Sequence, residues 1–223
     1  MNQTIETSTS IAVKICGITN AKQALEIADL GVKAIGVIGV KESKRYVEGN
    51  RRREIFDQLS IHFPRVERVW VVADCKKIKI ERAINEKGCP NVIQLHGSET
   101  HEECAELRAI NHAVKIWKAI RIKEENDLRI AQTYQNYVDA LLLDSWDEKK
   151  IGGTGKCIDP KILLSTDFKI PWWLAGGISK QAINKFLKNL SPYGIDVSSK
   201  VEISPGIKNI SEIKVLIDYL SKL

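Results

Sequence analysis

Short runs of valine, isoleucine and leucine recur along the chain, and stretches with helical spacing separate them. Runs of this length and composition are typical of strands that are buried on both faces of a parallel sheet. We therefore expect strands near residues 11–16, 34–40, 66–73, 92–95, 113–119, 138–144, 171–175 and 194–198.

Amphipathic patterns between these runs predict helices. Asn20 is a suitable N-cap for a helix that ends at Gly31, and Ser179 is suitable for a later one. Apolar residues at helical spacing predict further helices over 78–84, 104–110 and 210–220, and the weakest signal follows Asp159-Pro160.

Eight strands that alternate with helices indicate a parallel sheet with crossover connections. No Pro-, Gly- or Ser-rich linker divides the chain, so we expect a single (β/α)8 TIM barrel over residues 11–223. Residues 1–10 are polar and are interpreted as a flexible N-terminal leader. The second choice is an open doubly wound sheet, but Cys16-Gly17-Ile18-Thr19 is not the glycine-rich loop that such a sheet carries after its first strand.

Composition narrows the class of protein only moderately. The chain has 223 residues, 43% of them hydrophobic and 28% charged, which fits a soluble globular protein. A net charge of +6 is compatible with nucleic acid, an anionic surface or a small anionic substrate, or with a solvated basic surface. Basic and aromatic residues are not clustered as nucleic-acid binding would require, so we expect no nucleic-acid partner.

The five cysteines, at positions 16, 75, 89, 104 and 157, form no Cys-x-x-Cys pair. We therefore expect no metal, and reduced thiols in a cytoplasmic protein. No apolar stretch approaches the roughly 20 residues of a membrane span, and residues 1–10 lack the features of a secretory signal.

Reactive side chains stand at or near the ends of the expected strands: Cys16, His96, Asp144 and Asp196. A barrel brings the carboxyl ends of its strands together at one mouth, where such enzymes place their active sites. Side chains alternate faces along a strand, so Lys14 should point inward below Cys16. A buried ammonium group needs a partner, and we expect it to be Asp196 on the strand that closes the barrel.

Anion-binding groups are also present. Arg45 follows the second strand and could hold a carboxylate through two hydrogen bonds, whereas Arg51-Arg52-Arg53 is interpreted as the solvated start of a helix. Backbone N–H groups of glycine- or serine-rich turns can bind phosphate, and the loops after strands seven and eight often do so in barrels. The candidates are Gly153-Thr154-Gly155, Gly176-Gly177 and Ser198-Ser199. The first could equally be a mobile glycine loop, because the spacing of a P-loop is missing.

Seven motifs occur in order from about Ile11 to the C-terminus, and together they are specific. They are Lys14-Ile15-Cys16-Gly17-Ile18-Thr19, Ser43-Lys44-Arg45-Tyr46, Gln94-Leu95-His96-Gly97, Leu142-Leu143-Asp144-Ser145, Gly152-Gly153-Thr154-Gly155, Ala175-Gly176-Gly177 and Asp196-Val197-Ser198-Ser199. On these motifs the chain resembles the phosphoribosylanthranilate isomerase family.

The resemblance implies a (β/α)8 barrel that performs an Amadori rearrangement in tryptophan biosynthesis, as a monomer or homodimer, with no metal or organic cofactor. Asp144 matches the general acid that opens the sugar ring, and Cys16 matches the general base that removes the C2 proton. Arg45 matches the group that holds the anthranilate carboxylate. The other expected substrate-binding residues are His96, Gly153, Thr154, Gly155, Gly176, Gly177, Asp196, Ser198 and Ser199.

The chain departs from the family pattern at two places. The segment around Gly39 lacks the aromatic residues and proline that usually precede the Ser-Lys-Arg motif, and Lys200 stands where glycine usually follows Ser198-Ser199.

Two other functions remain open. An indole-3-glycerol phosphate synthase-like lyase would need a catalytic lysine and carboxylates at other strand ends. A barrel that binds sugar phosphate without converting it would need only the anion-binding turns, and not the acid and the base.

Overall fold

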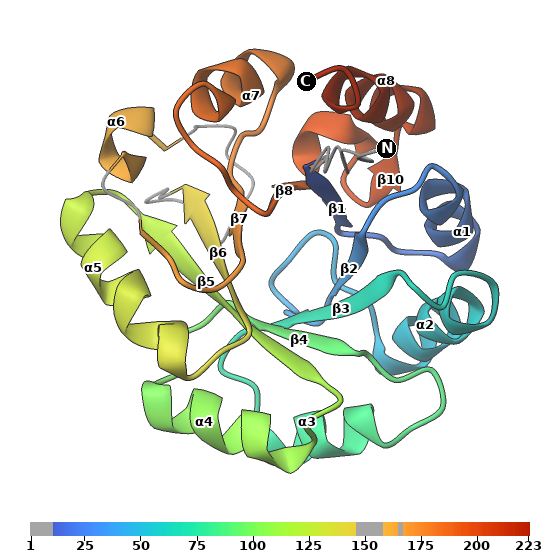
Figure 1. Cartoon of the computed structure of the whole chain (residues 1–223). Coiled ribbons are helices and arrows are strands. Elements are labelled where there is room, and N and C mark those ends of the chain that lie inside the picture. The colour runs from blue at the N-terminus through green and yellow to red at the C-terminus, as the bar shows by residue number, and fades with distance from the viewer. Residues whose placement is uncertain (1–10, 146–157, 165–166) are drawn as a thin grey trace, which may run out of the picture.

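Eight parallel strands close into a barrel in the computed structural model, which describes residues 11–145, 158–164 and 167–223 (Figure 1). The strands are β1 (Ala12–Cys16), β2 (Ala34–Ile38), β3 (Glu67–Val72), β4 (Val92–Leu95), β5 (Lys115–Ile122), β6 (Ala140–Ser145), β7 (Trp172–Leu174) and β8 (Gly194–Val197). They pair in sequence order, and β8 pairs with β1, which excludes the open sheet. The predicted leader lies outside the described residues.

Helices surround the barrel (Figure 1). They are α1 (Ala21–Asp29), α2 (Gly49–His62), α3 (Lys77–Ile84), α4 (His101–Ile110), α5 (Glu125–Thr133), α6 (Pro160–Leu163), α7 (Lys180–Leu187) and α8 (Ile210–Leu220). Two short 3₁₀ turns, η1 (Tyr134–Asn136) and η2 (Ser199–Val201), and a small hairpin of β9 (Glu202–Ser204) and β10 (Ile207–Lys208) complete the described elements.

Local signals explain several helix starts. The side chain of Asn20 accepts a hydrogen bond from Gln23 N, and that of Ser179 accepts one from Ala182 N, as the sequence predicts.

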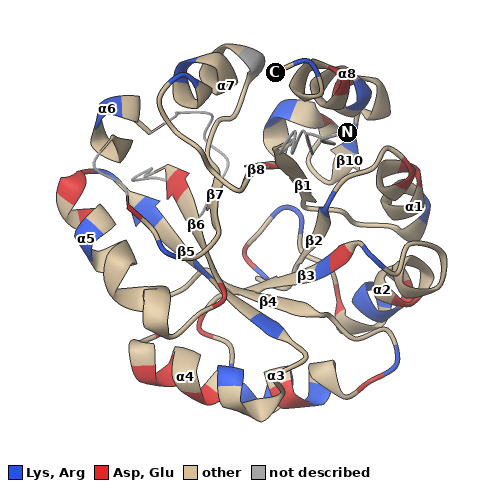
Figure 2. Ribbon diagram, viewed as in Figure 1, with Lys and Arg blue, Asp and Glu red and all other residues tan. Residues whose placement is uncertain are grey.

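Charged residues lie mainly on the outer helices (Figure 2). Among the described helices, none is both long and apolar enough to cross a bilayer.

Alternation along the strands creates two apolar regions. Residues of one face pack against the helices, whereas those of the other face fill the barrel. Inside the barrel, Trp117 and Trp173 are almost completely buried and their rings lie 5.0 Å apart. Gly194 allows this packing, because a Cβ there would come within 2.5 Å of the Trp173 ring. The indoles fill the interior, so polar side chains near the carboxyl ends of the strands border the remaining space.

The prediction of a solvated arginine run is wrong for Arg52. Arg52 is buried, and its guanidinium carbon lies 4.4 Å from the centre of the Trp70 ring. The helix already begins at Gly49, so Arg52 falls on the same face as the buried residues Ile55, Phe56 and Leu59. Helical spacing places it inward, and stacking on the indole partly offsets its burial.

A buried ion pair supports the loop after β4. Lys118 Nζ lies 2.9 Å from Glu99 Oε2 and also donates to the carbonyl of Gly97 at 2.8 Å. The same carboxylate accepts hydrogen bonds from the backbone N–H groups of Gly97 and Asp74. Glu99 therefore links the loops after β3 and β4, immediately beyond His96.

We predict that Glu99→Ala destabilises the protein by about 3–5 kcal/mol, because it leaves Lys118 charged, buried and unpaired. Denaturant unfolding measures the effect. Glu106→Ala is the matched control: its pair with Lys77 has the same 2.9 Å separation but side chains that are 61% and 48% exposed. The control should lose less than about 1 kcal/mol. Equal losses in the two variants would contradict the stabilising role of the buried pair.

Candidate active site

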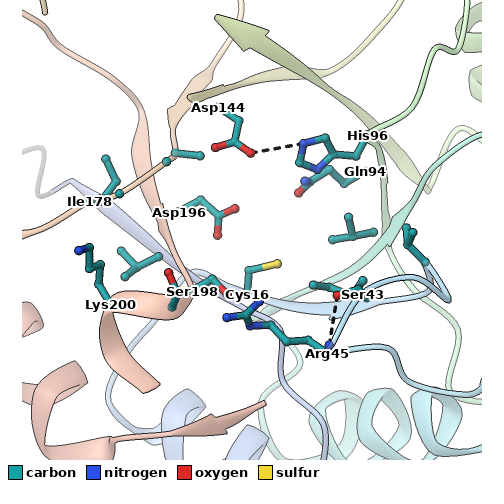
Figure 3. Close-up of a pocket in the computed structure, with 18 residues that line it drawn as sticks. Cys16, Ser43, Arg45, Gln94, His96, Asp144, Ile178, Asp196, Ser198 and Lys200 are labelled. Carbon is teal, nitrogen blue, oxygen red and sulfur yellow. Dashed lines mark hydrogen bonds and ion pairs between the residues drawn. The ribbon is translucent and has the colours of Figure 1, made fainter. Parts of the chain in front are cut away.

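A cavity of about 820 Å³, counted out to its open mouth, lies at the carboxyl ends of the strands. Its polar lining brings together residues that are far apart in the sequence (Figure 3). They are Cys16, Ser43, Arg45, Gln94, His96, Asp144, Gly176, Gly177, Asp196, Ser198, Ser199 and Lys200. Nine of the predicted site residues thus line one cavity. The predicted Gly153, Thr154 and Gly155 lie outside the described residues, so their place stays a prediction.

Cys16 ends β1 and is 7% exposed. Burial raises the pKa of its thiol, while the positive charges of Lys14 and Lys208 oppose that rise. Gly36 on the neighbouring strand leaves space for this group, since a Cβ there would lie 2.8 Å from Cys16 Sγ and 3.2 Å from Lys14 Nζ. The thiol is therefore enclosed, with an ammonium group directly beside it.

Lys14 and Asp196 form the pair that strand alternation predicts. Their positions are aligned across the β1–β8 pairing, and Lys14 Nζ lies 2.9 Å from Asp196 Oδ2. Burial alone would lower the pKa of Lys14, but the nearby Asp196 and Cys16 outweigh it and raise that pKa. The second oxygen, Asp196 Oδ1, is buried and accepts no hydrogen bond from the described part of the chain. Asp196 borders the cavity, so its carboxylate keeps an unused acceptor oxygen at the cavity wall.

Asp144 reaches the cavity from β6, opposite Cys16 on β1. One carboxylate oxygen accepts from Ser145 N at 2.9 Å, and the other lies 3.4 Å from His96 Nε2. Figure 3 shows His96 and Asp144 directed toward each other at the cavity wall. Gln94, two residues before His96, shares its strand face and lies deeper in the barrel. Its Oε1 is buried and accepts no hydrogen bond from the described residues.

Arg45 is held at the mouth by the carboxylate of Glu202, a residue that the sequence patterns did not predict. Its Nε and Nη2 donate to the two oxygens of Glu202 at 2.8 and 2.6 Å. Lys208 Nζ donates to Glu202 Oε1 at 2.7 Å and to the carbonyl of Ser198 at 3.2 Å. These hydrogen bonds outweigh burial and hold the pKa of Glu202 below its ordinary value.

The sequence holds only a weak signal for Glu202 and Lys208. They are two charged residues on either side of Gly206, which has a φ of 84°. Only the pairing of β9 with β10 shows that they meet.

The expected phosphate-binding turns border the same cavity. Gly176 and Gly177 have φ values of 80° and 61°, a left-handed conformation that glycine adopts without strain. A Cβ on Gly176 would also meet Ser145 Oγ at 2.3 Å. Ser198 and Ser199 follow β8, the strand next to β7, at the start of η2, and line the cavity together with Lys200. Two turns rich in backbone N–H groups therefore flank the space.

The described residues contain no cluster of three or more histidine, cysteine, aspartate or glutamate side chains that could hold a metal ion. The cysteines within the described ranges are free thiols: Cys16, Cys75, Cys89 and Cys104.

A closed parallel barrel whose reactive side chains gather at the carboxyl ends of its strands defines a (β/α)8-barrel enzyme. Residues 13–219 match the family model of N-(5'-phosphoribosyl)anthranilate (PRA) isomerase. The chain belongs to this family of isomerases.

Individual relatives agree with the family match. The N-(5'-phosphoribosyl)anthranilate isomerase of Gloeothece citriformis is 40% identical over 210 residues, which cover 94% of each chain. The crystal structure of phosphoribosyl anthranilate isomerase from Thermotoga maritima has a TM-score of 0.83 at 31% identity and covers 96% of this chain and all of that one. A crystal structure of the isomerase in complex with reduced 1-(o-carboxyphenylamino)-1-deoxyribulose 5-phosphate has a TM-score of 0.79 at 30% identity, with 96% of this chain and 100% of that chain covered.

We predict that Lys14→Met raises the pKa of Cys16, because it removes the positive charge beside the thiol. The alkylation rate of Cys16, followed by mass spectrometry of its peptide, should reach its plateau at a higher pH. Asp196 would lose its partner, so unfolding at pH 7 should also require about 3 kcal/mol less. At pH 7 the pair contributes fully, since a raised lysine pKa loses its stabilisation only as the pH rises through that value.

Lys115→Met is the control for this experiment. Lys115 pairs with Glu67 at the other end of the barrel and is half exposed. It should leave the Cys16 titration unchanged. An unchanged titration in Lys14→Met as well would show that Lys14 does not act on the thiol.

Proposed function

We propose that the protein catalyses the Amadori rearrangement of N-(5-phosphoribosyl)anthranilate to 1-(2-carboxyphenylamino)-1-deoxyribulose 5-phosphate, a step of tryptophan biosynthesis. One observation carries the proposal. Cys16 on β1 and Asp144 on β6 enter a single cavity. Arg45 and the two turns expected to bind phosphate also line it. An acid, a base and two anion-binding places are the groups that this reaction needs.

Asp144 is the proposed general acid. Its carboxyl group donates a proton to the ring oxygen of the sugar, the bond from that oxygen to C1 breaks, and the nitrogen lone pair forms a Schiff base with C1. His96 Nε2 lies 3.4 Å from the carboxyl group and has no hydrogen-bond partner among the described residues, so a small approach would let it hold Asp144 in place.

Cys16 is the proposed general base. Its thiolate removes the proton from C2, and the electrons of that bond form the enolamine as the Schiff base is neutralised. Tautomerisation then returns a proton to C1 and leaves a ketone at C2, so the rearrangement needs no oxidant or reductant. Because burial raises the pKa of the thiol, the nearby charge of Lys14 matters for forming the thiolate.

The two ends of the substrate carry negative charge, and each has a candidate site. Arg45 would bind the ring carboxylate, and Ile38 and Val40 line the adjacent wall as apolar partners for the ring. The turns at Gly176-Gly177 and Ser198-Ser199 would bind the phosphate, with Asp196 and His96 on the sugar between them. Gly153 to Gly155 would close over the substrate, which remains a proposal.

The lyase alternative is less well supported. It needs a catalytic lysine and carboxylates at other strand ends. Lys14 is fully buried in its pair with Asp196, and Lys200, which lines the cavity, lies in η2 and not at a strand end. A barrel that binds without converting its ligand would not need both Cys16 and Asp144 in the cavity. We also propose a cytoplasmic location and a monomer or homodimer.

Cys16→Ser and Asp144→Asn should each lower kcat by at least about 100-fold, since each removes one proton-transfer group. An alcohol is too weak a base at pH 7, and an amide cannot donate the proton. Steady-state kinetics with the phosphoribosylated substrate measure this. Cys75→Ser, a thiol outside the cavity lining, is the control and should keep wild-type turnover.

Complementation tests the pathway assignment. The wild-type gene should restore growth without tryptophan to a strain that lacks this isomerase, whereas either site variant should fail. Failure of the wild-type gene, with the protein folded and expressed, would favour the binding-only alternative.

A phosphate or sulfate soak tests the anion site. The anion should bind at the backbone of Gly177 and the Ser198-Ser199 turn, because oriented N–H groups favour an anion without a particular side chain. Density that appears only beside Arg51 to Arg53 would contradict the assignment.

A further inference from the structure

We propose that Glu202 is a positioning residue that joins the two anion-binding ends of the cavity. It holds the guanidinium of Arg45 on one side and, through Lys208, the turn at Ser198 on the other. This inference rests on the proposed function, because it assigns the ring carboxylate to Arg45 and the phosphate to the Ser198 turn.

The contact with Arg45 fixes the direction of the guanidinium. A guanidinium has five N–H groups in a plane, and Glu202 accepts one from Nε and one from Nη2, at 2.8 and 2.6 Å. The opposite edge, around Nη1, is then directed away from Glu202, and Arg45 is part of the cavity lining. Two parallel hydrogen bonds define an orientation that a single contact would not.

The stem of Arg45 is also confined. Gly17 follows Cys16, and a Cβ at Gly17 would lie 2.5 Å from Arg45 Cδ. Arg45 N donates to Ser43 Oγ at 3.1 Å. With its stem against Gly17 and one edge on Glu202, the side chain stays next to the thiol, as Figure 3 shows.

Lys208 extends the contact to the phosphate turn. Its side chain is fully buried, and Nζ donates to Glu202 at 2.7 Å and to the carbonyl and hydroxyl oxygens of Ser198 at 3.2 and 3.4 Å. Glu202 Oε1 also accepts from Gly206 N at 3.2 Å, and the carbonyl of Gly206 accepts from Thr19 at 2.8 Å. One carboxylate thus ties the hairpin, the Ser198 turn and Arg45 together.

Charge explains why a carboxylate is needed here. Arg45 and Lys208 both contact a side chain that is only 4% exposed, and without its negative charge two cations would face each other with little solvent. With Glu202 ionised, the three groups carry one net positive charge. This leaves the mouth attractive to an anion while keeping both cations in fixed places.

The test separates positioning from general stability by comparing two ligands. The probes are reduced 1-(o-carboxyphenylamino)-1-deoxyribulose 5-phosphate and the same compound without the ring carboxylate, with dissociation constants from calorimetry. Wild type should prefer the carboxylate form by about 10- to 100-fold, the range of a charge-assisted hydrogen bond. In Glu202→Gln, which keeps the size of the side chain, the preference should fall below about 5-fold, close to that of Arg45→Met.

Two further variants complete the design. Glu67→Gln is the matched control: Glu67 is a buried carboxylate 2.6 Å from Lys115 at the other end of the barrel, so it should keep the wild-type preference. Lys208→Met should weaken binding of ribose 5-phosphate but keep the preference for the carboxylate. If Glu202→Gln does not fold, Glu202→Asp takes its place, and its shorter reach should give an intermediate preference.

A wild-type preference in the Glu202 variant would overturn the inference, since loss of stability alone weakens both ligands equally. A stronger preference would also overturn it, because Glu202 would then compete with the substrate for Arg45. Failure of the proposed function gives different results: a protein for another ligand binds neither compound, and a barrel that only binds sugar phosphate binds the probes but does not restore growth without tryptophan.

Discussion

The parallel pairing of β8 with β1 is the constraint on which the rest of the structure depends. It closes the barrel, and its register aligns Lys14 with Asp196 inside it. A slip by one residue would turn Asp196 to the helix side and leave Lys14 buried without a partner, at a cost of several kcal/mol. The ion pair therefore favours one register, and that register sets which side chains of β1 and β8 face the cavity.

The same pair shapes the chemistry above it. Cys16 lies on the same face of β1 as Lys14, one alternation closer to the mouth. Enclosure by the barrel favours the neutral thiol, whereas the ammonium group of Lys14 favours the thiolate, and burial is the larger effect. A group that stabilises the closed barrel thus also sets the basicity of the proposed base.

Two buried carboxylates organise the loops at the mouth in a similar way. Glu99 pairs with Lys118 and accepts from the backbone of Asp74 and Gly97, while Glu202 pairs with Lys208 and accepts from Gly206. Each carboxylate fixes the backbone of a loop at the mouth of the barrel. The positions of these loops therefore depend on buried ion pairs as well as on the loop residues themselves. Glu202 differs from Glu99 because it also binds Arg45. Glu202 follows β8 and Arg45 follows β2, so their contact spans β1.

The order of apolar runs determined the eight strands, and the period of two placed Lys14 with Cys16 and Asp196 with Ser198 on shared strand faces. The cost of burying Lys14 without a partner pointed to Asp196 on the same face of the neighbouring strand. Helix caps at Asn20 and Ser179 were equally local. Only the tertiary structure decided that Arg52 is buried on Trp70 and that Glu202 and Lys208 meet Arg45 and Ser198. Arg45 and Glu202 are 157 residues apart, Glu202 and Lys208 meet across a hairpin without an apolar pattern, and Arg52 needs both the early start of α2 and the indole of β3, so these contacts depend on how separate elements pack.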